Sequence, residues 1–545
     1  MSADAKREVW SSVTGAEQSA EKLAEAVERY ITDHPESAVL EDGTLLFDLR
    51  LARYSLSLAH GRCLLQFWSE ERNLVRTVVD AQLRAGCLRL ITRRMGVSKP
   101  GALEIVGQRD RRTPTARESE RRQYQRLLER VLRRQFPDWT PDGFRSAADL
   151  EHSFGPAYVR GQLLQGSRGM QAEAVIGVGA AESRAIVDGV LTVGLLWMDH
   201  CRTHNVGKSA RQRHYGALRV IVPVGMEQTT AARMRWLHPG LAAWRLFTLD
   251  EKTEELTAVE IQEDGNQSLR LTHAFDAQAA IERAQPGIET LLALLPAHSA
   301  ACVEVRAREA TEVALLLEGL EFARIRQQAA YGSFARTFEV TFGAGGNETP
   351  LNEETEPLCR SLLARLFAAR HPNGTIKDAL FRLQTERWLE SRIRTGMVEF
   401  LPSLRQEFLY TQVPAMASGD RGMMDLLTVD RSGRMVILEV KADEDLHLPL
   451  QALDYWMRVR ALHGDRGLDR ATGRVLDAFQ RNGYFPGVEI SDSPPKILLV
   501  APALRIHPAN EIVLRYLSPQ VDWELLAVGE DWRSSLKTVF HKRRE

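Results

Sequence analysis

The sequence has few cysteines and no long apolar run, and each absence excludes a class of protein. Only five of its 545 residues are cysteine, and no two of them have the CxxC spacing of a zinc ribbon or a redox pair. A disulfide framework and a four-cysteine iron–sulfur cluster are therefore poorly supported. No apolar run approaches the ~20 residues that a membrane-spanning helix needs. Because the first ten residues, MSADAKREVW, also lack the apolar segment of a signal peptide, we expect a cytoplasmic protein with no membrane contact.

The chain also lacks a net charge of either sign, but its charges are unevenly distributed. The formal net charge is −1, whereas residues 50–136 hold twenty Lys and Arg against eight Asp and Glu. A local surplus of this kind suits phosphate contact and makes binding sensitive to salt. Residues 109–134 predict a basic helix. Its arginines either contact nucleic acid or pair with acids, on the same helix, elsewhere on the chain or on a partner protein.

Length and composition predict a multidomain α/β protein, α+β overall. Hydrophobic residues make up 44% and charged residues 26%, as in ordinary globular proteins with a sizeable core. Turn-forming stretches suggest a basic N-terminal α+β domain (1–136), a second α/β domain (137–274), a third α/β domain (275–374) and a C-terminal domain (375–545). We further expect a helix over residues 69–84 and a strand running into a helix over residues 303–324.

One C-terminal stretch, residues 421–456, carries the clearest chemical pattern. A short apolar run contains Asp425, a turn follows at residues 430–433, and residues 435–440 are aliphatic enough for a buried strand. The two arms predict a hairpin with Asp425 on the first arm and Glu439 and Lys441 at the end of the second. Residues two apart on a strand share a face, so Glu439 and Lys441 should point the same way. Two carboxylates that converge repel each other, and a Mg²⁺ or Mn²⁺ ion between them would resolve that repulsion.

This arrangement resembles the PD-(D/E)xK nuclease superfamily, which includes restriction endonucleases and RecB-type nuclease modules. By position, Asp425 matches the motif aspartate, and Glu439 and Lys441 match its ExK. Gly422 precedes the aspartate by three residues, as in the GxxD variant, so the family's proline is absent here. A lone ExK is weak evidence, and the flanking residues extend the match.

Upstream, Glu390 lies on an expected helix and resembles the acid that many members carry on their first core helix. Downstream, Gln451 and Tyr455 lie four apart, hence on one helix face, and resemble the QLxxY helix of mismatch- and branch-cleaving members. The resemblance covers roughly residues 382–462, a modest fraction of the chain. It implies a C-terminal restriction-endonuclease-like domain with a mixed sheet.

By the same resemblance, the protein would hydrolyse phosphodiester bonds in DNA with Mg²⁺ or Mn²⁺. Asp425 and Glu439 would hold the metal with the Val440 carbonyl, and Glu390 would help to hold it or a second ion. Lys441 would orient or help to deprotonate the attacking water.

The two residues of the downstream helix, Gln451 and Tyr455, would position phosphate or support the catalytic lysine. The first three domains would bind DNA, a protein partner or a regulator. An RNA-cleaving nuclease and a nucleic-acid-binding scaffold with an inactive nuclease fold are the alternatives, and roles in DNA repair and in defence against foreign DNA are both open.

Three further patterns are weaker. Gly177 and Gly179 resemble part of a phosphate-binding loop, but Glu182 occupies the third glycine position. His200 and His204 lie four apart on an expected helix and could ligate zinc, although surface and core roles are favoured because no second pair follows. The strand–helix–strand pattern of residues 137–273 could be a degenerate copy of the nuclease core without the ExK.

Overall fold

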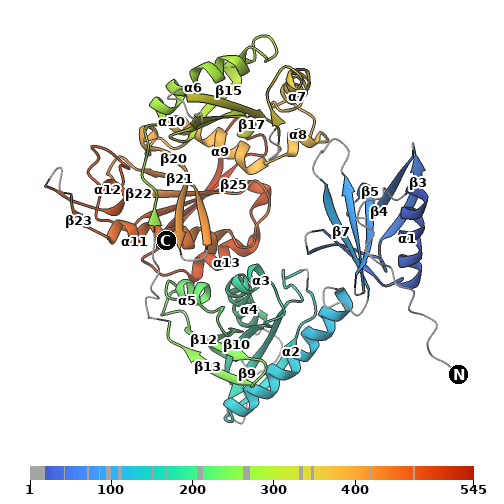
Figure 1. Ribbon diagram of the computed structural model, residues 1–545. Coiled ribbons are helices and arrows are strands. Elements are labelled where there is room, and N and C mark those ends of the chain that lie inside the picture. The colour runs from blue at the N-terminus through green and yellow to red at the C-terminus, as the bar shows by residue number, and fades with distance from the viewer. Residues whose placement is uncertain are drawn as a thin grey trace.

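The computed structural model contains four large sheets, each with its own helices, so the predicted multidomain α/β character is confirmed (Figure 1). Among the described residues, none of the helices combines the length and apolarity that crossing a membrane requires. The structure describes residues 19–41, 43–59, 61–69, 73–84, 86–93, 100–107, 113–149, 151–165, 170–204, 213–261, 270–329, 336–344, 349–417, 420–469 and 473–544.

The first unit is an antiparallel seven-stranded sheet with one helix packed on it. The sheet has the order β2-β1-β7-β6-β5-β4-β3, and α1 shares its apolar core. Its elements are α1 (Ala20–Asp33), β1 (Ala38–Glu41), β2 (Thr44–Asp48), β3 (Arg53–Ala59), β4 (Arg62–Trp68), β5 (Asn73–Arg84), β6 (Cys87–Arg93) and β7 (Gly101–Val106). The helix predicted over residues 69–84 is wrong. Residues 73–84 form strand β5, because the valines and Thr77 favour extended backbone and the two neighbouring strands complete the hydrogen bonds, while residues 70–72 lie outside the described residues.

The second unit is a mixed six-stranded sheet covered by helices on both faces. Its order is β13-β12-β11-β10-β9-β8. Its elements are α2 (Pro114–Gln135), β8 (Trp139–Arg145), β9 (Tyr158–Gln165), β10 (Gln171–Val178), α3 (Arg184–Asp188), α4 (Val190–His204), β11 (His214–Pro223), α5 (Gln228–Met234), β12 (Ala243–Asp250) and β13 (Glu255–Val259). Tyr124 and Leu128 of α2 pack against Val175 and Ile221 of this sheet. The first unit therefore ends before α2, earlier than the boundary expected after residue 136.

The third unit is an antiparallel five-stranded sheet, β15 to β19 in sequence order. Its elements are α6 (Ala277–Leu292), η1 (Ala300–Cys302), β15 (Val303–Glu309), β16 (Glu312–Leu317), β17 (Leu320–Ala329), β18 (Arg336–Phe342), β19 (Thr349–Pro350), α7 (Glu356–Ala369) and α8 (Ala379–Arg382). The helix predicted within residues 303–324 is wrong, because a tight turn at Glu318-Gly319, both with positive φ, reverses the chain into a strand. A Cβ on Gly319 would lie 2.0 Å from the Arg387 carbonyl oxygen, so this turn rests directly on the fourth unit.

The fourth unit is a mixed seven-stranded sheet with the order β14-β20-β21-β22-β25-β26-β27. Helix α9 packs on one face, and α11 and α13 pack on the other. The elements are β14 (Arg270–Leu271), α9 (Thr385–Thr395), α10 (Met397–Phe400), η2 (Gln406–Phe408), β20 (Tyr410–Ala417), β21 (Asp420–Val429), β22 (Met435–Val440), α11 (Leu448–Gly464), β23 (Gly467–Leu468), β24 (Val475–Leu476), α12 (Ala478–Arg481), β25 (Lys496–Pro502), η3 (Ala503–Arg505), α13 (Pro508–Tyr516), β26 (Asp522–Val528) and β27 (Thr538–Arg543). The predicted hairpin is β21–β22, and Gly433 in its turn has a φ of +82° that favours glycine.

The second and fourth units share one topology. From β8 to β13, successive neighbours in the sheet pair antiparallel, antiparallel, parallel, parallel and antiparallel. The series β20, β21, β22, β25, β26 and β27 has the same five pairings in the same order. The helices correspond as well: α2 and α9 precede the sheets, while α4 and α11, then α5 and α13, form the two crossovers. The chain therefore contains the same fold twice.

The two copies meet through equivalent elements. Helix α4 packs against α13, and α5 packs against α11. The amide of His238 donates to the carbonyl of Tyr516 at 2.8 Å, and the amide of Ser518 donates to the carbonyl of Trp236 at 2.7 Å. Around these bonds the sequence itself repeats, R-W-L-H-P at 235–239 and R-Y-L-S-P at 515–519. Equal contacts in both directions are the pattern of a two-fold dimer interface, formed here within one chain.

Candidate active site

The register of the β21–β22 hairpin brings two acids together. Leu426 pairs with Leu438, so the adjacent position places Asp425 directly opposite Glu439, and residues directly opposite across strands share a face. The Asp425 Oδ2 atom accepts a hydrogen bond from the Val440 amide at 3.1 Å. The structure thus places both predicted acids at one end of the sheet, each held by buried strand backbone.

Both carboxyl groups lie where an ionised acid is costly. Burial, together with the charge of Asp425, raises the pKa of Glu439 well above its ordinary value, and its side chain is almost completely buried. Burial also raises the pKa of Asp425, against the lowering effects of the Val440 amide and the Arg387 guanidinium. Within the described part of the chain, the Glu439 Oε2 atom is buried without a hydrogen-bond partner. An oxygen ligand without a partner beside a second carboxylate fits a divalent metal ion such as Mg²⁺ or Mn²⁺.

Lys441 lies on the same face and is surrounded by acids. Its Nζ atom is 3.6 Å from Glu439 Oε1, 3.6 Å from Glu386 Oε1 and 3.9 Å from Asp445 Oδ2. Burial lowers the pKa of Lys441, but the neighbouring carboxylates, Glu439 foremost, raise it by more, so the net shift is upward. The ammonium group is therefore protonated at neutral pH and acts as a fixed positive charge at the site.

Glu390 reaches this site from α9, but two arginines hold its carboxylate. Arg387 Nη1 lies 2.6 Å from Glu390 Oε2 and 3.8 Å from Asp425 Oδ1, and so bridges the two acids. Arg306, from β15 of the third unit, lies 3.5 Å from Glu390 Oε1. Burial raises the pKa of Glu390, although both arginines oppose that rise. In this arrangement Glu390 positions Arg387 over Asp425.

The two predicted residues of α11 lie one helical turn apart. Both Gln451 and Tyr455 are half-buried. Burial raises the pKa of the Tyr455 phenol, and the charges of Glu439 and Asp425 raise it further, which places this hydroxyl within the field of the acids. Tyr455 is therefore a neutral hydrogen-bond donor at neutral pH.

Sequence reasoning did not assign site roles to four charged residues: Arg306, Glu386, Arg387 and Asp445. A signal existed for Glu386, which lies four residues before Glu390 and hence on the same face of α9. Arg306 had no local signal, because only the packing of the third unit against α9 brings it to the site. The site has more acidic than basic side chains. The five acids are Asp425, Glu386, Glu390, Glu439 and Asp445, and the three bases are Lys441, Arg387 and Arg306. This negative surplus also suits a divalent cation.

The second unit lacks the two strand acids, Asp425 and Glu439, at the equivalent positions. Strands β11 and β25 both end in proline. Two residues before each proline, Ile221 of β11 pairs with Gly177, and Val500 of β25 pairs with Val440. Glu439 therefore corresponds to Ile176, which pairs with Arg160, so a buried arginine stands where the fourth unit has Asp425. The absence of an ExK noted in the sequence holds in three dimensions.

The glycine of β10, Gly177, serves packing. A Cβ on Gly177 would lie 2.7 Å from the Tyr124 hydroxyl, so this glycine lets α2 approach the sheet. Glu182, at the third position of the incomplete glycine motif, pairs with Arg121 at 2.6 Å. The glycine-rich loop at 343–350 lies partly outside the described residues.

The arginine-rich helix α2 divides its charges between two uses. Arg130 and Arg134 both pair with Glu254 of the second unit, and Arg122 pairs with Glu118 one turn away. Part of the local surplus of positive charge is therefore neutralised by acids of the same chain, as the interpretation that these arginines pair with acids requires. Arg126 and Arg133 are exposed on the same helix.

No protein-family model matches the sequence, and neither does any curated protein. Functional inference therefore depends on the geometry and electrostatics of the site itself.

Proposed function

We propose that the fourth unit is a PD-(D/E)xK-type nuclease domain and that the protein hydrolyses phosphodiester bonds in DNA with Mg²⁺ or Mn²⁺. The observation that supports this most directly is Glu439, a buried carboxylate opposite Asp425 with an oxygen that lacks a partner among the described residues. A purely structural acid at such a position would cost stability without return. Lys441 lies 3.6 Å from Glu439 on the same strand face, which supports the resemblance of this pair to the ExK motif.

Each residue has a role that its environment supports. A metal ion held by Asp425 and Glu439, with the Val440 carbonyl as a further oxygen ligand, would activate water and stabilise charge on the phosphate. Because the surrounding acids raise the pKa of Lys441, its ammonium group would orient the attacking water and offset phosphate charge. Arg387, fixed by Glu390, adds a second positive charge beside Asp425.

The helix residues Gln451 and Tyr455 complete the binding surface. The Tyr455 phenol stays protonated, so it can donate a hydrogen bond to a phosphate oxygen. Gln451, one turn earlier on the same face of α11, can position the same phosphate with its amide.

The proposal is tested by cleavage assays on duplex DNA, single-stranded DNA and RNA, each with Mg²⁺, with Mn²⁺ and with a chelator. We expect metal-dependent cleavage of DNA, and a loss of at least ~10²-fold in Asp425→Asn and in Lys441→Ala, because single catalytic groups are worth that much. Glu444→Gln is the matched control, since Glu444 is an exposed acid three residues beyond Lys441, and it should cleave at the wild-type rate. Cleavage of RNA alone would replace DNA by RNA as substrate. No metal-dependent cleavage of any substrate would overturn the proposal in favour of a binding scaffold.

A further inference from the structure

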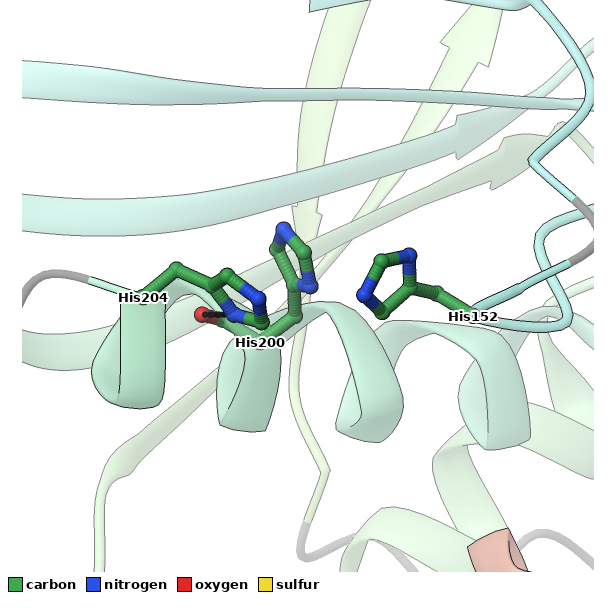
Figure 2. Close-up of side chains that lie close together, drawn as sticks. All are labelled: His152, His200 and His204. Atoms are coloured by element: carbon green, nitrogen blue, oxygen red, sulfur yellow. Dashed lines mark hydrogen bonds between the residues drawn. The ribbon is translucent and has the colours of Figure 1, made fainter.

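A cluster of three histidines lies in the second unit, away from the carboxylates of the fourth (Figure 2). His200 and His204 lie one turn apart at the end of α4, and His152 approaches them from the connection between β8 and β9. One nitrogen from each of the three rings lies within 4.8 Å of the others. We infer that these three imidazoles form a site for Zn²⁺, or for a similar nitrogen-binding transition metal, with water completing the coordination.

In His152 and His204 the hydrogen bonds use Nδ1 and leave Nε2 available to bind a metal. His152 Nδ1 lies 3.0 Å from Asp149 Oδ1, and His204 Nδ1 lies 3.2 Å from the His200 carbonyl oxygen. When Nδ1 donates its hydrogen to an oxygen, Nε2 carries the lone pair that a metal needs. A carboxylate on the far nitrogen of a ligating histidine is the usual outer partner in zinc sites, and Asp149 occupies that position.

The third ring supplies an unused nitrogen. Among the described residues, the His200 Nδ1 atom is buried and has no hydrogen-bond partner. Stacking on Trp197, with ring centroids 5.3 Å apart, accounts for the packing of His200. The exposed His204 ring in turn stacks on His200, with ring centroids 3.9 Å apart, which holds it beside the same point.

The loop that carries His152 is held in shape. Asp149 and Phe154 exchange two backbone hydrogen bonds of 2.9 Å, and the intervening Ser153 has a positive φ of 60°, which is uncommon for a residue with a side chain. The Ser153 hydroxyl lies 3.0 Å from His507 Nε2 of the fourth unit. A metal bound by this loop and α4 would therefore also fix a contact between the two copies of the fold.

Two arginines near the cluster oppose a cation, and one acid favours it. Arg145 is exposed, with its guanidinium over the Trp197 ring at 5.3 Å, and the buried Arg160 lies over the Phe154 ring at 4.8 Å. Asp149 supplies negative charge beside His152. Nitrogens bound to one tetrahedral Zn²⁺ are about 3.3 Å apart at normal Zn–N lengths, so modest ring rotations, easiest for exposed His204, close the site.

The experiment titrates the untagged full-length chain with ZnCl₂ in excess Mg²⁺, which occupies carboxylate sites, and reads binding by calorimetry and unfolding temperature. We expect one equivalent of Zn²⁺ to bind and raise the unfolding temperature of the wild type and of the control His273→Ala, which alters an exposed histidine elsewhere. His152→Ala and His204→Ala should each lose that equivalent, and Asp149→Asn should bind ~10–100-fold more weakly. Cobalt substitution adds a spectroscopic test, since tetrahedral Co²⁺ should give visible absorption in the wild type and in His273→Ala, but not in His152→Ala or His204→Ala. If folded His204→Ala or His152→Ala binds Zn²⁺ as the wild type does, the site is refuted, and the nuclease proposal is unaffected.

Discussion

The backbone amide of His238 donates to the carbonyl of Tyr516, and the reverse contact, from Ser518 to Trp236, joins the equivalent atoms of the other copy. The two α/β units therefore sit as the halves of a two-fold dimer, although they belong to one chain. Only one half carries the acids, because Arg160 and Ile176 stand where the fourth unit has Asp425 and Glu439. A symmetric nuclease dimer offers one catalytic centre to each strand of a duplex, whereas under the proposed function this chain would have one centre on its two related units.

The first prediction is therefore that one chain cuts one strand at a time. Supercoiled plasmid should convert to the nicked circle, and linear DNA should appear only later, as nicks accumulate at rates that depend on enzyme concentration. Gel analysis of the time course checks this. Linear product formed in step with the nicked circle at low enzyme concentration would mean that two active centres act together, on two chains.

The sequence predicted the β21–β22 hairpin better than it predicted the sheets of the first and third units. The hairpin from Asp425 to Lys441 was predictable because its turn, its apolar runs and its alternation are all local. The strand β5 was missed because its extended backbone depends on pairing with β4 and β6. The turn at Gly319 was missed because it rests on α9, which lies far away in sequence. Propensity alone is overridden where such tertiary partners complete the hydrogen bonds.

The same distinction separates the site residues. Glu439 and Lys441 share a strand, so the two-residue period placed them on one face. Arg306 and Glu390 meet through packing between units, and no spacing in the sequence reports it. His152 likewise joins His200 and His204 only through a loop between two strands, which is why the histidine pair on α4 looked incomplete.

The second prediction concerns stability at the metal site. Because the folded pKa of Glu439 is raised well above the ordinary value near 4.5, its contribution to stability is favourable below that value and is lost as pH rises through the folded pKa. Above that pH the ionised carboxylate lowers the free energy of unfolding by about 1 kcal/mol for each unit by which the pKa is raised. Glu439→Gln removes this cost, because an amide does not ionise. In chelator, the variant should resist urea better than the wild type at pH 8 and show little advantage at pH 4.5. Equal stabilities at both pH values would contradict an ionisation cost at Glu439.

The third prediction concerns the interface between the two copies. Arg233 of α5 makes two hydrogen bonds, of 2.9 and 2.7 Å, to the Asp454 carboxylate on α11. Removing one partner of a largely buried pair leaves the other uncompensated, so Arg233→Ala should destabilise the fold by about 3 kcal/mol. Denaturant unfolding followed by tryptophan fluorescence measures this. Arg235→Ala, in which an arginine just beyond the same helix is altered, is the comparison and should cost less.

The fourth prediction concerns the source of DNA affinity. The first unit has its own apolar core, whereas α2 belongs to the second unit, so the informative truncation removes residues 1–107 and keeps α2. If arginines of the first unit bind phosphate, the truncated chain should bind DNA more weakly. Its log–log slope of affinity against salt should also be flatter, by roughly 0.7 to 0.9 for each phosphate that the first unit neutralises in the full chain.

Helix α2 is tested separately by Arg126→Gln with Arg133→Gln, since both side chains are exposed. Arg130→Gln serves as the matched control, because Arg130 already pairs with Glu254. Fluorescence anisotropy across a salt series gives both the affinity and the slope. Equal slopes for the full chain and the truncation would assign the first unit to protein contacts, and equal slopes for the α2 variants as well would leave DNA binding to the fourth unit alone.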